Sequence, residues 1–471
     1  MIQGYAIPNA TMLGNNGAYK SEFYKALEGA KAAGATVEDA PCLLARGVNA
    51  YNAGLPSTPS LLIVPQFYKA GNLYQDVPPF VAEDSTMRFT VSRNTTATRV
   101  NSSGLIESVA SGVPRIDWLG QSCPALLVEP SGSNGIRNNS MVGANVSTNA
   151  LPTNWLTTLN GLSRQIIAIG TESGIDYIDI KLSGTANNTV ATIAPESSTQ
   201  IVAASGQTWT NSVYIKIISQ PSPPSSYSLA FREGTSGGSF VNSGSSAITP
   251  TTTLQRLSAT RTLTGATTER VQPQINFALV SGSTYDFTVR IGWPQMEQSS
   301  VATSPIPTTT AAVSRAADVI TASGALVSGL IGQTEGTMYC EFEATNDAST
   351  RRLLTLSDGS QLNRIMLIYI SGQWRAQIQS TSILLGNLTS GYHKIAFAYQ
   401  QNGVSGNLFA SVDGGAVVSG TSATFITSLT MVNLGKIEDT GSSSFLNARI
   451  RAAALYTTRL SNDQLAELTR L

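Results

Sequence analysis

Residues 275–297 read INFALVSGSTYDFTVRIGWPQME, two runs of alternating apolar and polar residues separated by Ser-Gly-Ser. A period of two is typical of β-strands, and Gly and Ser between two such runs are typical of a turn. Similar short runs recur through residues 151–310, with turn residues at roughly every 8 to 12 positions. This pattern predicts a β-sandwich or jelly roll for this part of the chain.

The rest of the chain divides around this segment. At roughly 100 to 200 residues per domain, 471 residues predict three or four domains. We expect a small α/β region over residues 1–86, a β-rich connector over 87–150, the jelly roll over 151–318 and a second β-sandwich over 319–471. The Pro/Thr-rich stretch at residues 304–320 predicts a hinge. The fold class is therefore mainly β and multidomain.

Three short helices are also predicted. Ser21 is a suitable N-cap for the first, and the second runs from Val37 to Tyr51. The third runs from Ser461 to Leu471, with Leu465 and Leu468 on its buried face.

Composition excludes several classes of function. Only 12% of residues are charged, and 29 basic side chains balance 29 acidic ones, so we expect neither nucleic-acid binding nor membrane insertion. His393 is the only histidine, which excludes a His-based triad or a multi-His metal site within one chain. The three cysteines lie far apart in the sequence. We expect them to be free thiols in a protein that assembles in a reducing cytoplasm. The N-terminus lacks the pattern of a signal peptide.

The connector holds three basic and three acidic residues that we expect to form structural ion pairs and not a binding site. They are Arg93, Arg99 and Arg115 with Glu107, Asp117 and Glu129.

Two groups of residues resemble known families. LFASVDGGAVVSG (408–420) and ARIRAAALYTTRLSNDQLAELTRL (448–471) resemble the hairpin, last strand and closing helix of concanavalin A-like, laminin-G-like lectin domains. SRNTTATRVNSSGLIESVASGVPRIDW (92–118) and CPALLVEP (123–130) resemble a block of tailed-bacteriophage fibre, spike and head-decoration proteins. In those proteins the block precedes a carbohydrate-binding-module-like jelly roll that ends in a phrase similar to IGWPQMEQSSVATSPIPTTTAAVSRAAD (291–318).

These resemblances imply a structural protein of a phage virion, assembled in the host cytoplasm. Residues 1–86 would attach it to other virion proteins, and the two sandwiches would contact host or mucosal glycans. The family also implies a homo-oligomer, most often a trimer. We expect no enzymatic activity. Two alternatives stay open: a purely architectural protein that reinforces the capsid or tail, and an extracellular glycan-active enzyme or its accessory subunit.

Aromatic rings that can stack on a sugar are the first candidates for a binding site. The tryptophan candidates are Trp155, Trp209, Trp293 and Trp374, and alternation along the strand turns Trp293 inward. Tyr369, Trp374 and Arg375 form the predicted sugar platform. The alternative that Trp374 belongs to the core stays open.

Carboxylates in turns are candidate ligands for a calcium ion, which takes six to eight oxygens. Asp358 and Asp413 are the two candidates, and no other cofactor is expected. Both precede Gly, so each could instead serve the geometry of an ordinary hairpin turn. Glu341 and Glu343 share one face of a strand, but a solvated strand face explains them better than a catalytic carboxylate pair.

Overall fold

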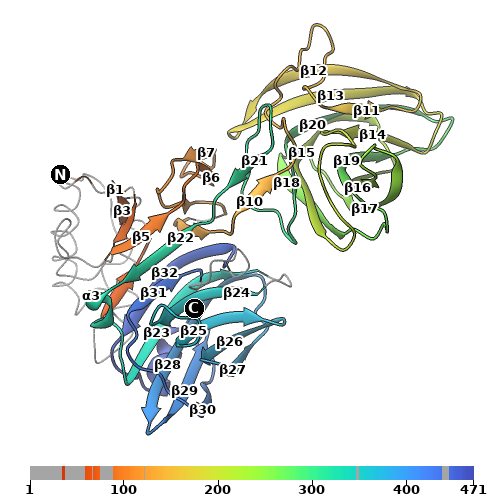
Figure 1. Ribbon diagram of the computed structural model, residues 1–471. Helices are drawn as coiled ribbons and strands as arrows, with labels where there is room; N and C mark the ends of the chain where they lie inside the picture. The colour runs from red at the N-terminus through yellow and green to blue at the C-terminus, as the bar shows by residue number, and fades with distance from the viewer. Residues whose placement is uncertain are drawn as a thin grey trace. The chain divides into compact units, whose positions relative to one another are not determined.

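A computed structural model confirms the mainly β, multidomain sandwich fold (Figure 1). The structure describes residues 34, 36–37, 59–65, 67–69, 71–74, 88–120, 122–345, 350–436 and 445–470. Backbone contacts divide the chain into two compact units. Unit 1 contains Met1–Gly104, Ser108–Pro130 and Ala316–Leu471, and unit 2 contains Leu105–Glu107 and Ser131–Arg315.

Unit 2 is a sandwich of two antiparallel five-stranded sheets. Sheet I has the order β11 (Leu156–Thr158), β14 (Val190–Ala194), β19 (Arg270–Ala278), β16 (Ser226–Gly234), β17 (Phe240–Ile248). Sheet II has the order β12 (Leu162–Glu172), β13 (Ile175–Thr185), β20 (Thr284–Glu297), β15 (Thr208–Ser222), β18 (Gln255–Thr262). A two-stranded ribbon pairs β10 (Gly132–Asn134) with β21 (Val313–Arg315), close to the points where the chain enters and leaves the unit.

The core of unit 2 lies between its two sheets. Alternate residues of the strands face it, among them Ile178, Ile180 and Leu182 of β13 and Phe287, Val289 and Ile291 of β20. This is the pattern that the alternating sequence predicts for strands buried on one face.

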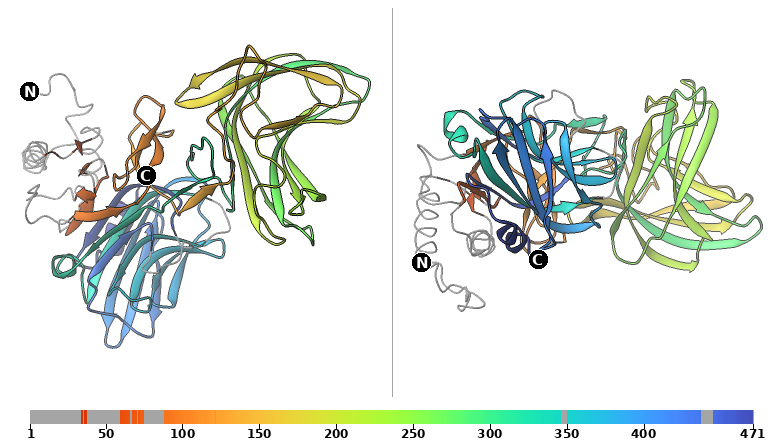
Figure 2. Two further views of the ribbon diagram at one scale, coloured as in Figure 1. Left: turned by 45° about the horizontal axis from the view of Figure 1, so that its top comes forward. Right: turned by 90° about the horizontal axis from the view of Figure 1, so that it is seen from below.

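Unit 1 is a second sandwich, in which the described strands form two large sheets (Figure 2). Sheet III has the order β1 (Thr36–Val37), β3 (Phe67–Lys69), β4 (Asn72–Tyr74), β5 (Arg88–Ser92), β22 (Val319–Ser323), β31 (Met431–Leu434), β24 (Arg351–Ser357), β25 (Arg364–Ile370), β26 (Gln373–Ile378), β27 (Thr381–Gly386). Sheet IV has the order β30 (Val418–Ser422), β29 (Ser405–Val412), β28 (Gly391–Asn402), β23 (Glu335–Ala344), β32 (Ala448–Tyr456), β9 (Ala125–Val128), β8 (Ile116–Asp117), and β2 (Leu61–Ile63) also pairs with β32. Outside these sheets, β6 (Ala97–Val100) pairs with β7 (Ile106–Val109).

Two short helices complete unit 1 in the described part of the chain. α3 spans Ala325–Ser328, and α4 spans Asn462–Leu468. Ser461 is the N-cap of α4 and exchanges a reciprocal pair of hydrogen bonds with Gln464. Leu465 and Leu468 are buried and the helix contacts β28 and β29, which confirms the predicted closing helix.

The range predicted as a connector is not a separate unit in the described residues. Strands β5, β8 and β9 lie within the sheets of unit 1, and Phe89, Val91, Leu126 and Val128 are part of its core. Unit 2 is thus an insertion in the sequence of unit 1, between Pro130 and Ala316.

The prediction of a hinge at residues 304–320 is wrong for its first part. Ile306 and Thr308 are buried. The side chain of Asn139 donates to the carbonyl of Ile306 and accepts from the amide of Thr308, at 3.1 and 2.7 Å. Because side-chain amides satisfy its backbone, this Pro/Thr-rich segment is held in place without helix or strand periodicity.

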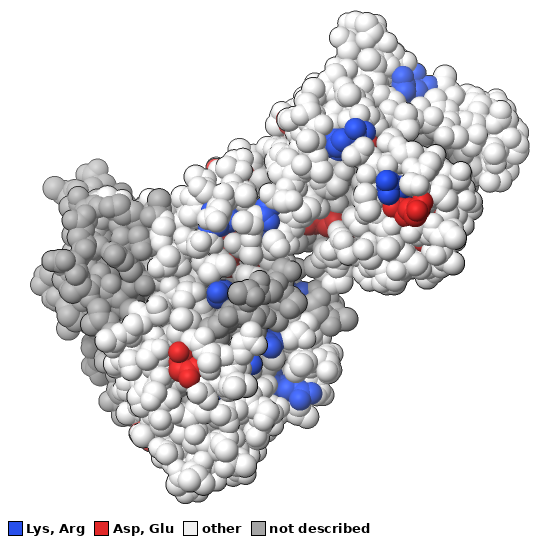
Figure 3. Space-filling model, in the orientation of Figure 1, with Lys and Arg blue, Asp and Glu red and all other residues white. Residues whose placement is uncertain are grey.

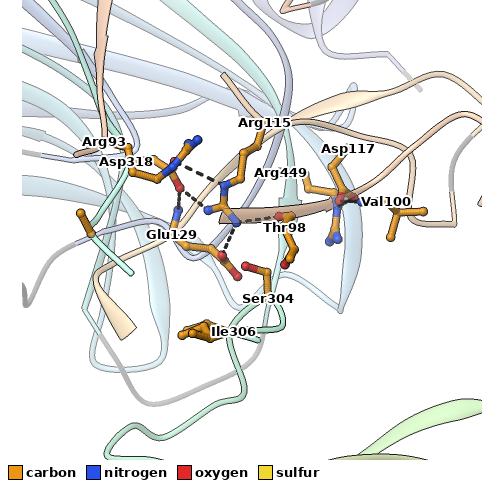
Figure 4. Close-up of polar contacts among 12 residues, drawn as sticks. Arg93, Thr98, Val100, Arg115, Asp117, Glu129, Ser304, Ile306, Asp318 and Arg449 are labelled. Atoms are coloured by element: carbon orange, nitrogen blue, oxygen red, sulfur yellow. Dashed lines mark hydrogen bonds and ion pairs between the residues drawn. The ribbon is translucent and has the colours of Figure 1, made fainter. Parts of the chain in front are cut away.

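A buried ion cluster joins the two chain segments of unit 1 that flank the insertion (Figure 4). Asp318 accepts hydrogen bonds from Arg93 Nη1 at 2.8 Å, from Arg115 and from the amide of Glu129 at 3.0 Å. Arg115 Nη1 also donates to Glu129 Oε2 at 2.6 Å. Burial alone would lower the pKa of Arg115, but Asp318 and Glu129 outweigh it and raise the pKa. Arg115 and Glu129 therefore form a structural ion pair, as the sequence predicts. Arg93 and Asp117 also form structural ion pairs, but with Asp318 and Arg449, which lie outside the predicted set.

The remaining predictions concern the N-terminal helices, the cysteines and membrane insertion. The helix from Ser21 and most of the second predicted helix lie outside the described residues, although Val37 itself belongs to β1. Cys340 is a buried free thiol, whereas Cys123 is disulfide-bonded, so the prediction of free thiols is wrong for Cys123. No helix among the described residues is long and apolar enough to span a membrane.

Candidate functional site

The predicted aromatic platform lies in the core of unit 1. Trp374 is 1% exposed and Tyr369 is 4% exposed. The Trp374 ring centroid lies 4.5 Å from that of Phe342 and 5.5 Å from that of Tyr369. The prediction that these two rings bind a sugar is therefore wrong, because a buried ring offers no face to a ligand.

The local turn explains this orientation. Ser371 and Gly372 both have positive φ, at 52° and 79°, and form a two-residue hairpin turn that pairs Tyr369 with Trp374. Both rings then point to the same side, which is the core side. Arg375, one residue further, points to the opposite face of the sheet and is half-buried. The other tryptophan candidates, Trp155, Trp209 and Trp293, are also buried.

The two candidate calcium ligands both make hydrogen bonds within the protein. Asp358 accepts from the amide of Ser360 at 2.8 Å and from Asn363 Nδ2 at 2.7 Å, and the hydrogen bonds from Ser360 lower its pKa. Asp413 has a φ of 50°, accepts from the amide of Lys394 at 2.8 Å and lies 2.5 Å from His393 Nδ1.

Neither carboxylate fits a calcium site. In the part of the chain that the structure describes, no group of three or more His, Cys, Asp or Glu side chains is placed to hold a metal ion. Each carboxylate already accepts hydrogen bonds, Asp358 from within its own turn and Asp413 from Lys394 of the neighbouring strand β28.

Glu341 and Glu343 each have an arginine partner. Arg451 Nη1 lies 3.1 Å from Glu341, and Arg449 Nη1 lies 2.8 Å from Glu343. The arginines hold both glutamates in ion pairs on the strand face of sheet IV.

The charged cluster on the outer face of sheet II is internally satisfied. Arg290 makes two hydrogen bonds of 2.8 Å to Asp179 and one of 2.5 Å to Glu172, and its guanidinium lies 3.3 Å from the ring centroid of Tyr177. Lys216 pairs with Glu172 at 2.7 Å. The hydrogen bonds that Arg290 donates to Asp179, followed by the one that it donates to Glu172, raise the pKa of Arg290 against the opposing effect of burial. With its donors engaged, this cluster stabilises the sheet and has little left to offer a ligand.

The outer face of sheet I is different, because amides line it. Along β19, Val271, Ile275 and Phe277 face the core. Gln272, Gln274 and Asn276 alternate with them and lie on the opposite face, where Gln272 is buried and Gln274 and Asn276 are half-buried. We call the outward side chains of Gln272, Gln274 and Asn276, with Thr192 of the neighbouring strand β14, the amide face.

Hydrogen bonds with neighbouring groups fix the orientation of these amide side chains. Gln272 Nε2 donates to the carbonyl of Glu196 at 2.8 Å, and Gln274 Nε2 donates to Gln272 Oε1 at 3.1 Å. Thr192 Oγ1 donates to Asn276 Oδ1 at 2.9 Å. One acceptor, Gln274 Oε1, and one donor, Asn276 Nδ2, then have no hydrogen-bond partner among the described residues.

These two groups are arranged for a polyhydroxylated ligand. Gln274 and Asn276 are half-buried and lie two positions apart on one strand, with Ile275 between them, about 7 Å along it. A hydroxyl group both donates and accepts, so a row with one free acceptor and one free donor can bind neighbouring hydroxyls. On β17, an edge strand of the same sheet, Phe240 is 63% exposed, with the Arg232 guanidinium 5.7 Å from its ring centroid. An exposed ring of this kind can stack on a sugar.

Sequence reasoning missed the amide face, although a signal was present. Residues 271–278 read VQPQINFA, in which amide residues occupy every second position of a strand. Alternation predicts that they share one face, but tryptophans are the stronger sequence signal for sugar binding and placed the prediction elsewhere.

The chain was compared with protein families, curated proteins and solved structures, and only solved structures match it. No family model matches the chain, and no curated protein matches it. The CBM40 domain of a Ruminococcus gnavus sialidase, bound to α2,3-sialyllactose, is 19% identical over 30% of this chain and 84% of that chain, with a TM-score of 0.25. Domains LG4-5 of the mouse laminin α1 chain are 12% identical over 64% of this chain and 94% of that chain, with a TM-score of 0.23. The tripod from the baseplate of bacteriophage Tuc2009 is 14% identical over 71% of this chain and 98% of that chain, with a TM-score of 0.26. These values assign the chain to no family.

Proposed function

We propose that this chain is a structural protein of a tailed-phage virion that displays carbohydrate-binding β-sandwiches on a fibre, spike or head decoration. The amide face of sheet I is the observation that carries the carbohydrate part of the proposal. The sequence resemblance of residues 92–130 and 291–318 to phage proteins supports the virion part.

The chemistry favours weak and repeated contacts with neutral sugars. Side-chain amides exchange hydrogen bonds with water for hydrogen bonds with sugar hydroxyls, and the net gain for each is only about 0.5–1.5 kcal/mol. Two free groups and one exposed ring therefore predict low affinity for a single site. Many copies on one particle would raise the effective affinity, because linked sites bind at high local concentration.

A paired substitution tests the site. Gln274→Ala combined with Asn276→Ala should abolish binding to the neutral oligosaccharides that the unmodified protein recognises on a glycan array. Because both side chains are half-buried at the surface, the melting temperature of unit 2 should change little. Gln165→Ala, at an exposed amide on β12 of sheet II, is the matched control and should leave binding unchanged.

A second experiment tests the virion part of the proposal. Immunogold labelling of purified particles with an antibody against this chain should place it on their outer surface. An array on which the unmodified protein binds no glycan, together with particles that lose stability without the protein, would favour the architectural alternative.

A further inference from the structure

The geometry points to a site of spontaneous chemical modification at Asn402 in unit 1, where attack by the Gly403 amide releases the side-chain amide as ammonia. Asn402 is the last residue of β28, and Gly403 and Val404 form the two-residue turn that leads into β29. Glycine favours this reaction because it has no side chain to hinder the attacking nitrogen. The site lies in the other unit from the amide face and does not depend on the proposed function.

The tip of this hairpin is open to solvent. Asn402 and Gly403 are exposed, and Val404 is 82% exposed. The side chain of Asn402 makes no hydrogen bond with a described residue. Gly403 has a φ of 64°, and a Cβ placed on it would meet no atom within 4 Å, so there is room for a ring to form. The ladder ends at the pair Asn402–Ser405, so opening this one pair lets Asn402 rotate toward the nitrogen of Gly403.

The reaction needs only water as a second reactant. The nitrogen of Gly403 forms a bond to Cγ of Asn402 and loses its proton, and the side-chain nitrogen leaves as ammonia. The product is a five-membered succinimide ring. Water then adds to one of the two ring carbonyls and breaks its bond to the ring nitrogen, which gives aspartate or isoaspartate. Either product carries a negative charge at neutral pH, and isoaspartate also lengthens the main chain by one carbon.

Two other Asn-Gly pairs in the described part of the chain are protected. The side chain of Asn134 is buried and hydrogen-bonded to backbone groups through both amide atoms, and the Gly135 amide is itself hydrogen-bonded. Asn160 Nδ2 donates to the carbonyl of Val190 at 2.5 Å, and Gly161 lies against the backbone at the end of β13. These two pairs share the dipeptide sequence of the proposed site but not its exposure, so they are internal controls.

A new charge matters here because charges are few. The chain has 29 basic and 29 acidic residues and no net charge. Figure 3 shows large areas of the described surface, drawn white, that carry no Lys, Arg, Asp or Glu side chain. Each modified copy gains one negative charge at the tip of β28 and β29. Copies of the same sequence but different age therefore differ in net charge.

Peptide mapping by mass spectrometry, after incubation of the full chain in mildly alkaline heavy-oxygen water, tests the site. Asn402 should exchange its amide for an acid at least about ten-fold faster than Asn134 or Asn160, because those two react only after local opening. Both aspartate and isoaspartate should form at this position and carry heavy oxygen, whereas direct hydrolysis of the side chain gives aspartate alone. In denaturant the three pairs should react at similar rates.

A matched variant checks the consequence for charge. The isoelectric point of the unmodified chain should drift toward acid during incubation. Asn402→Gln should reduce this drift, because glutamine would have to close a six-membered ring, and Asn402→Asp marks the position of a copy with the added charge. Equal rates at the three pairs in the folded protein would overturn the assignment, as would an unreactive Asn402 in the folded chain. Aspartate without isoaspartate would overturn the cyclic route.

Discussion

Asp318→Asn tests the ion cluster that joins the two flanks of the insertion in unit 1. Asp318 is 2% exposed and accepts from two arginines and one backbone amide. Asparagine has nearly the same size but no charge, so Arg93 and Arg115 would each lose their ion pair with residue 318, while the pair of Arg115 with Glu129 would remain (Figure 4). Breaking a buried pair in this way costs about 3–5 kcal/mol.

The matched control is Asp286→Asn in unit 2. Asp286 pairs with Lys181, and their side chains are 40% and 33% exposed. An exposed pair of this kind contributes only about 0–1 kcal/mol. The same chemical change should therefore have a large effect at one position and a small effect at the other.

Amide hydrogen exchange is the suitable assay, because the two units need not unfold together. Asp318→Asn should lower the protection of β5 and β22 in unit 1 by about 3–5 kcal/mol, while β13 and β20 in unit 2 keep their protection. A loss below about 1 kcal/mol in unit 1, or an equal loss with Asp286→Asn, would refute the view that this cluster holds unit 1 together.

Two further predictions concern stability. Trp374→Ala should cost about 3–5 kcal/mol in the unfolding free energy of unit 1, because it removes a buried ring from between Phe342 and Tyr369; an unchanged melting temperature would contradict the burial of this ring. Burial would raise the pKa of Glu233, but hydrogen bonds from Thr268 and from the amide of Gly265 outweigh it and lower the pKa. The stability that this carboxylate contributes is present above its unfolded pKa of about 4.3 and is lost as pH falls through the lower folded value. Glu233→Gln should therefore make the unfolding free energy of unit 2 fall less steeply at acid pH. An equally steep fall in the variant and in the unmodified protein would contradict this role.

The sequence predicts the strands of both sandwiches well, and the direction of their side chains less well. In unit 2, polar and apolar residues alternate, so the inward face of β13 and β20 follows from the sequence. In β25, the run RIMLIYI is apolar at six consecutive positions, and no alternation tells which side faces the core. The direction of Tyr369 and its partner Trp374 therefore could not be derived, and the predicted platform depended on it.

Long-range pairing explains the other differences. The predicted connector became part of unit 1 because Leu126 of β9 pairs with Ile450 of β32, and no local pattern reveals a pairing between residues so far apart in the sequence. The hinge was predicted from Pro and Thr content, but Asn139 binds the backbone of this segment from far away in the sequence. Features that depend only on neighbouring residues were predicted more accurately, because the Asp413-Gly turn and the Ser461 cap are both found as predicted.

The most direct test of the central claim is a crystal structure of the full chain with a neutral oligosaccharide selected on the array. Our account predicts sugar hydroxyls within hydrogen-bond distance of Gln274 Oε1 and Asn276 Nδ2, on the outer face of sheet I. An oligosaccharide bound on any other face, with these two amide groups still facing solvent, would contradict it.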